Sequence, residues 1–415
     1  MKVSSTNFLE KKMRNNQLLG KKILVGVTGS IAIYKALELI RLFIKAGAEV
    51  KVLMSEDAKR FIAPLTFETI SQNKVLHADT ESWSEGLSHI HIGKWADLFV
   101  IAPASVNTIN KLSHGIADNL MTQTAIAFTK TIVLAPSANT NMMLNAITQE
   151  SLSKLSSLGY EIVAPQSKLL ACNDEGVGAL ADIEQIFYTC ARLLLKEPFW
   201  SEREVIITGG GTMEKIDDVR CLTNFSSGKQ ASALALAFYL RGANVTLISS
   251  GETPNIHAIN TLHVKSTAEL QAALLSQMQY ITKNDKTPYL LMAAAVSDYV
   301  PVTTHEGKLK KEELGETYNL ELKRNVDVLS SLPKKGFKMI GFKAEMDEKK
   351  ALENAGKMLI AKNLDAVCLN VLKEQNSFGS SKNEIHFITN ASVQKFSLAG
   401  KFEIAENIVE QCSHL

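Results

Sequence analysis

Short apolar strands alternate with amphipathic helices along this chain, and that alternation limits its fold more than any other feature. The first strand-like run is 22–27 (KILVGV), and 31–47 (IAIYKALELIRLFIKAG) has helical spacing and ends on a glycine. Further apolar runs follow at 48–54, 97–103, 131–136 and 160–165. Strands that alternate with helices in this way are typical of a parallel sheet with helices on both faces.

The pattern closes near residue 190 and starts again at 203–211 (REVIITGGG). A chain of 415 residues exceeds one typical hydrophobic core, so two domains are expected. We therefore predict an α/β protein with two doubly wound, Rossmann-like parallel-sheet domains. Later strands are expected at 244–250, 288–296, 337–344 and 364–370, and 384–389 (EIHFIT) is expected as an edge strand or hairpin member. The predicted divisions are a mobile tail at 1–20, a first domain at 21–190, a linker at 191–202 and a second domain at 203–415.

Composition excludes several classes of protein. The net charge of +2 gives no general reason to bind nucleic acid or an anionic membrane. The five cysteines are odd in number and form no CxxC, which favours a reducing compartment without disulfides or a zinc site. We find no apolar run of the ~18 residues that a membrane span needs, and residues 1–20 lack the apolar core of a secretory signal. These features predict a cytoplasmic protein that acts on small molecules.

Small polar residues follow successive strands of the first half. Ligands of doubly wound sheets bind beyond the carboxyl ends of the strands, so these loops form the candidate site. The set suits one phosphate and a neutral polar ring, although tight strand-to-helix turns would explain the glycine and serine equally well. The GxGxxG pattern of dinucleotide sites is absent. The candidate residues are Gly29, Ser30, Ser55, Ser105, Asn107, Asn139 and Met142.

Four motifs of this half, HIHIGKWADLFVIAPAS, GIADNL, PSANTNMM and ACNDEGVG, occur in an order that resembles the flavin-dependent phosphopantothenoylcysteine decarboxylase family. The resemblance implies a flavodoxin-like domain with FMN as its cofactor. It makes His89 the catalytic histidine, Asn139 the residue that orients the substrate carboxylate, and Cys172 a reactive thiol on a lid. The sequence departs from the family pattern at Ala138, Asn173, Ala179 and Leu180.

The chemistry implied by this resemblance needs a cofactor, because a simple α-amino carboxylate has no electron sink for the loss of CO₂. In the family, flavin oxidises the substrate thiol to a thioaldehyde, and the C=S group accepts the electrons as CO₂ leaves. His89 is expected to assist proton removal during the oxidation. Cys172 is expected to protonate the product when the enethiol is reduced.

The second half contains two glycine-rich turns and a run of lysines. Gly210 and Gly211 follow a strand, where backbone amides can bind an anion, and 226–229 (SSGK) precedes a helix. The latter is not a Walker A motif. Asp298 follows a predicted strand, and Lys308, Lys310 and Lys311 come shortly afterwards, as a nucleotide triphosphate with Mg²⁺ would require. Ordinary turns and a solvated lysine face are the alternative interpretation.

These motifs resemble the phosphopantothenate–cysteine ligase family, which bacteria often fuse behind the decarboxylase. The resemblance implies that CTP activates 4′-phosphopantothenate as an acyl cytidylate, which cysteine then attacks. It implies that Asn224 contacts the intermediate, that Lys308 neutralises phosphate charge and that Asp298 meets the nucleotide or its Mg²⁺. Departures occur at Met213, Ala231 and Val326, and the spacing of Lys357 and Lys362 is one residue wider than expected. The remaining implied binding residues are Gly210, Gly211, Arg220, Ser226, Ser227, Gly228, Ala293, Ala294, Asp327, Val328, Phe342, Lys357 and Lys362.

The sequence therefore predicts a bifunctional enzyme of coenzyme A biosynthesis, whose ligase product is the substrate of its decarboxylase. The resemblance also implies a homo-oligomer, with trimers of the decarboxylase and dimers of the ligase. Two alternatives are a nicotinamide oxidoreductase and a flavin-binding regulatory subunit. The choice between CTP and ATP is open at this point.

Overall fold

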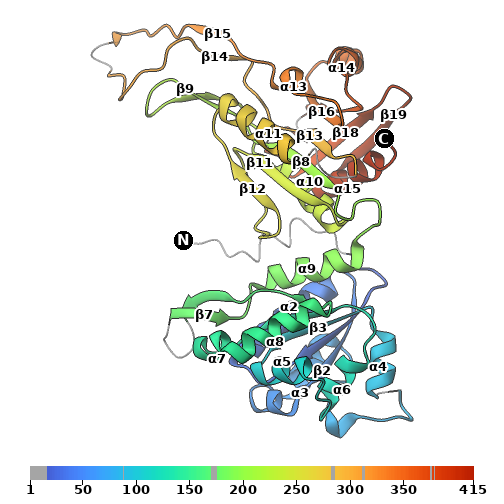
Figure 1. The fold of residues 1–415 in the computed structure, drawn as a ribbon. Helices are drawn as coiled ribbons and strands as arrows, with labels where there is room; N and C mark the ends of the chain where they lie inside the picture. Colours follow the sequence, from blue (N-terminus) through green and yellow to red (C-terminus); the bar gives the residue numbers. More distant parts are fainter. Residues whose placement is uncertain are drawn as a thin grey trace. The chain divides into compact units, whose positions relative to one another are not determined.

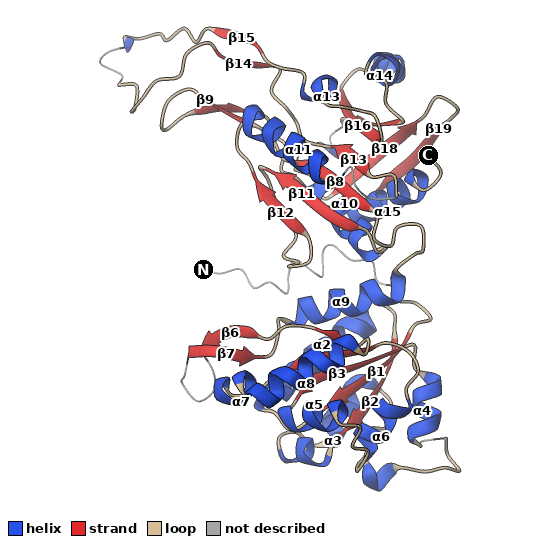
Figure 2. Ribbon diagram, viewed as in Figure 1, coloured by secondary structure: helices blue, strands red, loops and turns tan. Residues whose placement is uncertain are grey.

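A computed structural model describes residues 16–86, 88–169, 175–281, 286–310, 314–373, 376–377 and 379–415 (Figures 1 and 2). The chain divides into two compact units, 1–195 and 196–415, and each is described by itself. In the described part, no helix is long and apolar enough to cross a membrane. Cys172 and Asn173, which the sequence placed in the lid, and Lys311 lie outside the described residues.

The first unit is built on a five-stranded parallel sheet in the order β2-β1-β3-β4-β5. This is the 2-1-3-4-5 order of flavodoxin-like folds, in which the strand order reverses between β1 and β3. The strands are nearly continuous apolar runs because helices cover both faces. Their bounds are β1 Lys22–Val27, β2 Glu49–Met54, β3 Leu98–Ala104, β4 Ile132–Pro136 and β5 Glu161–Ile162, with a separate pair, β6 Gln166–Leu169 and β7 Glu175–Ala179.

The helices of this unit pack their apolar sides on the sheet. For example, Leu39, Ile40 and Phe43 of α2 are fully buried. The helices are α2 Tyr34–Lys45, α3 Pro64–Ser71, α4 His89–Trp95, α5 Val106–Ser113, α6 Leu120–Ala127, α7 Thr140–Leu144, α8 Ala146–Ser157 and α9 Ile183–Leu195. Three short 3₁₀ helices complete the unit, η1 Ile31–Ile33, η2 Glu56–Arg60 and η3 Ala78–Thr80.

The second unit has an eight-stranded sheet in the order β12-β11-β8-β13-β16-β17-β18-β19. Counted from β8, its six parallel strands follow the 3-2-1-4-5-6 order of nucleotide-binding folds, and the order reverses between β8 and β13. The last two strands are antiparallel, so 384–389 belongs to a hairpin at the sheet edge, as expected. The strands are β8 Glu204–Gly209, β11 Asn244–Ser249, β12 Asn260–His263, β13 Tyr289–Met292, β16 Lys338–Glu345, β17 Ala366–Val371, β18 Lys382–Ile388 and β19 Val393–Gly400.

The remaining elements of the second unit are five helices and two short antiparallel ribbons. The helices are α10 Lys229–Leu240, α11 Thr267–Ile281, α13 Val328–Ser331, α14 Glu348–Ala361 and α15 Lys401–Cys412. One ribbon pairs β9 Met213–Lys215 with β10 Cys221–Thr223, and the other pairs β14 Tyr299–Pro301 with β15 Leu322–Arg324. Figure 1 shows the β14–β15 ribbon as an arm that extends away from the sheet of this unit.

The doubly wound architecture predicted for both halves is confirmed, and two details of the predicted divisions differ. Residues 16–20 are not part of a free tail, because Leu18 is fully buried and its amide donates to the Ala46 carbonyl at 2.7 Å. The expected linker also has structure: α9 continues to Leu195, and Trp200 is fully buried in the second unit. There the Trp200 ring packs edge-on against Phe238 and Tyr289.

Candidate functional site

The loops after β1, β3 and β4 are tied together at the carboxyl edge of the first sheet. The Thr28 hydroxyl donates to the Pro103 carbonyl at 2.7 Å and accepts from the Ser105 amide at 2.8 Å. The Ser30 hydroxyl donates to the Ser137 hydroxyl at 3.2 Å. These bonds fix the strand ends at the point where the strand order reverses, the usual place for a ligand in such a sheet.

The predicted flavin residues lie in these loops with unequal roles. Ser30 caps η1 by accepting from the Ala32 amide at 3.3 Å, and Ser105 caps α5 by accepting from the Thr108 amide at 3.4 Å. Ser55 precedes η2, but its side chain makes no capping hydrogen bond. Asn107 is exposed in the first turn of α5.

Gly29 allows η2 to approach β1 closely. A Cβ at this position would lie 2.7 Å from the Cβ of Asp57. With buried hydroxyls and two helix starts at one sheet edge, the residues fit a flavin mononucleotide: amides and hydroxyls bind its phosphate, and neutral donors suit its ring.

Asn139 lies in the loop after β4, and strand β7 packs directly on this loop. Asn139 caps α7, with its Oδ1 accepting from the Asn141 amide at 2.9 Å. The Ala138 amide donates to the Gly178 carbonyl at 3.0 Å, and a Cβ on Gly178 would lie 2.3 Å from the Ala138 carbonyl oxygen. The glycines of the lid motif are therefore needed for this close packing. Met142, on α7, is 52% exposed.

Two positions that depart from the family pattern follow Gly178. Ala179 ends β7 opposite Gln166 of β6, and Leu180 is buried in the core. Both side chains therefore serve the local packing of the β6–β7 ribbon.

His89 is the first residue of α4, and Ser88 caps this helix. Figure 1 shows α4 and α7 on opposite sides of the first unit. Within one chain the structure therefore does not bring His89 together with Asn139, although the sequence assigned both to one reaction.

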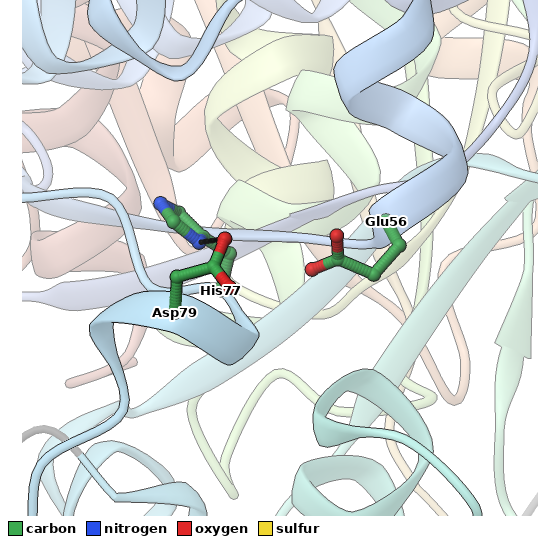
Figure 3. Close-up of side chains that lie close together, drawn as sticks. All are labelled: Glu56, His77 and Asp79. Atoms are coloured by element: carbon green, nitrogen blue, oxygen red, sulfur yellow. Dashed lines mark ion pairs between the residues drawn. The ribbon is translucent and has the colours of Figure 1, made fainter.

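A group that sequence reasoning missed, Glu56, His77 and Asp79, has the composition of a metal site (Figure 3). The Lys59 ammonium, however, lies 2.9 Å from a Glu56 carboxylate oxygen and 2.7 Å from an Asp79 carboxylate oxygen. The hydrogen bond from Lys59 also holds the pKa of Asp79 below its ordinary value. The ammonium thus supplies the positive charge that these carboxylates need, and the group is a surface ion-pair cluster.

The second unit contains a pocket of about 580 Å³ beyond the carboxyl ends of β13, β16 and β17, next to the start of α10. Most of the predicted ligase residues line it. They are Asn224, Ser226, Ser227, Gly228, Ala293, Ala294, Asp298, Asp327, Val328, Phe342 and Lys362. The departures Ala231 and Val326 also line it. Gly210, Gly211, Arg220, Lys308 and Lys357 do not.

Three loops meet behind this pocket at distances that only glycine allows. Gly210 has φ +82°, and a Cβ there would lie 2.4 Å from the Ser250 hydroxyl oxygen and 2.5 Å from the Gly251 amide nitrogen. A Cβ on Gly251 would in turn lie 2.6 Å from the Ser227 carbonyl oxygen. The Gly210 turn is therefore a support for the 226–228 loop, which faces the pocket.

Asn224 is held against the loop that follows β13. Its side-chain amide donates to the Ala295 carbonyl at 3.0 Å, and the Ala295 amide donates to the Gly210 carbonyl at 2.8 Å. A Cβ on Gly211 would lie 2.8 Å from the Asn224 carbonyl oxygen, so Gly211 also serves this packing. The carboxamide is thereby fixed at the pocket wall.

Asp217 organises the loop that carries Lys308. Its carboxylate is buried and accepts from the amides of Val219 at 2.8 Å, Arg220 at 2.7 Å and Leu309 at 3.1 Å. Burial by itself would raise the pKa of Asp217, but these hydrogen bonds outweigh it and hold the pKa below its ordinary value. Lys308 is thus positioned through its neighbours, while its own side chain is exposed.

Helix α14 presents Lys362 to the pocket and turns Lys357 away. Lys362 lies 2.7 Å from Asp327, whereas Lys357 is 70% exposed and lies 2.6 Å from Glu353. Residues five apart on a helix point in different directions, but residues four apart share a face. Accordingly it is Met358 that lines the pocket with Lys362, and the predicted role of Lys357 has no support in the geometry.

Three pocket lysines escaped the sequence analysis as candidates, namely Lys229, Lys343 and Lys401. Lys343 lies 3.1 Å from Glu345, and Lys229 donates to the Gly379 carbonyl at 2.8 Å. Burial and the nearby Lys229 charge lower the pKa of Lys401. The pocket is therefore rich in cations and suits an anionic ligand such as a nucleotide triphosphate.

Two sequence profiles of known families match the chain. The profile described as Flavoprotein matches residues 11–195. The DNA/pantothenate metabolism flavoprotein C-terminal domain matches residues 200–415.

Curated relatives match both halves together. The chain is 36% identical over 404 residues to the Coenzyme A biosynthesis bifunctional protein CoaBC of Haemophilus influenzae, covering 95% of this chain and 98% of that protein. It is 36% identical over 410 residues to the Bacillus subtilis protein of the same name, covering 96% and 98%. For the Escherichia coli protein of that name the identity is 34% over 376 residues, covering 89% and 91%.

Proposed function

This chain belongs to the family of bifunctional coenzyme A biosynthesis proteins, and from that premise we propose how its residues share the chemistry. The chain is a bifunctional enzyme with a phosphopantothenate–cysteine ligase and a phosphopantothenoylcysteine decarboxylase. The observation that carries this conclusion is the similarity to bifunctional relatives over nearly the whole chain, with a strand-end site in each unit.

In the ligase unit the carboxylate of 4′-phosphopantothenate attacks the α-phosphorus of CTP, which releases pyrophosphate and gives an acyl cytidylate. The amine of cysteine then displaces CMP. We assign the triphosphate to the cation-rich pocket and the acyl group to the wall formed by Asn224. Asp298 fits as a ligand of Mg²⁺, because this ion is usually held by one or two carboxylates together with substrate phosphates. Lys308 neutralises the developing phosphate charge.

In the decarboxylase unit the proposed cofactor is FMN, bound by the loops that contain Gly29, Ser30 and Ser105. When bound, the flavin supplies the two-electron chemistry on the substrate thiol that makes loss of CO₂ possible. His89 accepts a proton during the oxidation, and Asn139 orients the substrate carboxylate. Cys172, which lies outside the described residues, is assigned the proton that the product needs.

A homo-oligomer would complete both sites. His89 lies on the opposite side of the unit from α7, which Asn139 caps, and Lys308 is exposed on a loop outside the pocket. These positions favour an assembly in which one copy supplies the histidine or the lysine and a second copy supplies the rest, with trimers of the first unit and dimers of the second. A cytoplasmic location also stays part of the proposal, and the free thiols of Cys190, Cys221, Cys368 and Cys412 agree with it.

Separate assays of the two half-reactions test these assignments. Asn224→Asp and Lys308→Gln should slow release of CMP and pyrophosphate, while both variants should decarboxylate supplied phosphopantothenoylcysteine at the wild-type rate. The pure protein should show the absorption spectrum of one FMN per chain. An equal loss of both activities in either variant, or a protein that FMN cannot reconstitute, would contradict the assignments.

A further inference from the structure

His89 is held by a carboxylate that the motif comparison did not single out. The Nδ1 atom of His89 lies 3.1 Å from Oε1 of Glu81, and the same oxygen is 3.4 Å from the His89 backbone amide. Both side chains are about three-quarters buried, with exposed fractions of 24% and 27%. Glu81 therefore meets both polar groups that His89 presents at the start of α4.

The chemistry of the two partners fixes the direction of this hydrogen bond. A carboxylate can only accept, so the Nδ1 atom of His89 must carry the proton and donate it. In a neutral imidazole the second nitrogen, Nε2, is then left with a free lone pair. The contact thus selects the tautomer in which Nε2 is able to accept a proton.

The surroundings hold the ring in this orientation. The indole of Trp83 packs edge-on against the His89 ring, with ring centroids 5.5 Å apart. His91, two residues later, has a different partner: its Nδ1 lies 2.8 Å from the Ser88 hydroxyl. A hydroxyl can donate as well as accept, so Ser88 does not select a tautomer of His91. Only His89 has the carboxylate partner that fixes a base.

We propose that Glu81 is a positioning residue of the decarboxylase, which holds His89 in the Nδ1–H tautomer so that Nε2 accepts the substrate proton. Glu81 itself does not touch the substrate. The inference rests on the base role assigned to His89, and it extends that role to a residue outside the conserved-looking histidine motif. It also gives a reason for the acidic residue at the start of α4, where a negative charge is favourable.

Nuclear magnetic resonance of the full-length protein, labelled with nitrogen-15 in its histidine rings and measured without flavin, tests the tautomer directly. His89→Asn identifies the His89 signals by their loss. In the wild-type protein at neutral pH, Nδ1 should be the protonated nitrogen. In Glu81→Ala this preference should disappear, and in Glu81→Gln, whose side-chain oxygen can still accept, it should largely persist.

Anaerobic stopped-flow measurement of flavin reduction by phosphopantothenoylcysteine supplies the second readout. Glu81→Ala should slow reduction by about 10- to 100-fold, the usual effect of removing a group that orients a catalytic histidine. Flavin affinity and the substrate KM should stay unchanged, and Glu81→Gln should keep more of the rate than Glu81→Ala. Glu85→Gln is the matched control, because Glu85 lies in the same loop and pairs only with Lys74 at 3.4 Å among the contacts described for it; it should reduce flavin at the wild-type rate.

The outcomes separate this inference from the function on which it rests. A wild-type tautomer or a wild-type reduction rate in Glu81→Ala overturns the positioning role. If His89→Asn reduces flavin at the wild-type rate, the base assignment is wrong, whatever the tautomer measurement shows.

Discussion

Replacing Gly210 by alanine should disrupt the ligase unit through one close contact. The residue has φ +82°, and the added Cβ would lie 2.4 Å from the Ser250 hydroxyl oxygen and 2.5 Å from the Gly251 amide nitrogen. The left-handed backbone costs an alanine about 1–2 kcal/mol. Relieving the clash moves the loop at 250–251 and costs about 1–3 kcal/mol more, as in other overpacked sites.

Gly336 provides a matched control for the backbone cost alone. It has φ +85°, but a Cβ there would meet nothing within 4 Å. Gly336→Ala should therefore lose only the first contribution, and the difference between the two variants should be about 1–3 kcal/mol. Because Gly210 supports the loop that faces the pocket, Gly210→Ala should also reduce ligation, while decarboxylation of supplied substrate continues.

Urea unfolding of the second unit measures this difference. The chain has three tryptophans, and Trp200 is fully buried in the second unit. In a Trp83→Phe, Trp95→Phe background its fluorescence reports the unfolding of that unit alone, which avoids treating a two-domain chain as one transition. If Gly210→Ala and Gly336→Ala have equal free energies of unfolding, the packing argument is refuted.

Three further predictions follow from side-chain environments. Asp217→Asn should destabilise the second unit at neutral pH. Because the folded-state pKa of Asp217 is lowered, the difference in free energy of unfolding should disappear as the pH falls below about 3.9, the ordinary aspartate value; a difference that is constant with pH would contradict this. Lys362→Met should raise the KM for the nucleotide by about tenfold or more, as expected for a lost charge-assisted contact, whereas Lys357→Met should leave it unchanged; equal effects would place the helix face wrongly. Burial raises the pKa of the thiols of Cys190, Cys368 and Cys412, so native protein treated with iodoacetamide should be alkylated at exposed Cys221 far faster than at these three, as mass spectrometry of the peptides would show.

The strands and the strand-end loops could be predicted because their signals are local. Apolar runs of five to eight residues followed by glycine or serine identify a buried parallel strand wherever they occur. The ribbons β6–β7, β9–β10 and β14–β15 were missed because they are short and lack alternating apolar residues. Their pairing depends on contacts between loops, such as that between Ala138 and Gly178, which no local pattern reveals.

The candidate sites show the same division. Motif comparison placed most of the ligase residues in one pocket, but it also placed Lys357 there, and helical geometry gives that position to Met358. Glu81 was missed because its contact with His89 spans eight residues and depends on the path of the loop between them. The cations Lys343 and Lys401 come from β16 and α15, far apart in the sequence, and only the folded sheet brings them to one pocket.

The most direct test of the division of labour between the two units is a product analysis of His89→Asn. This variant is supplied with 4′-phosphopantothenate, cysteine, CTP and Mg²⁺, and CMP, CO₂ and phosphopantothenoylcysteine are measured together. Phosphopantothenoylcysteine should accumulate in equal amounts with CMP, without CO₂, because the ligase unit is intact and the decarboxylase lacks its base. Production of CO₂ at the wild-type rate, or a failure to release CMP, would contradict the account.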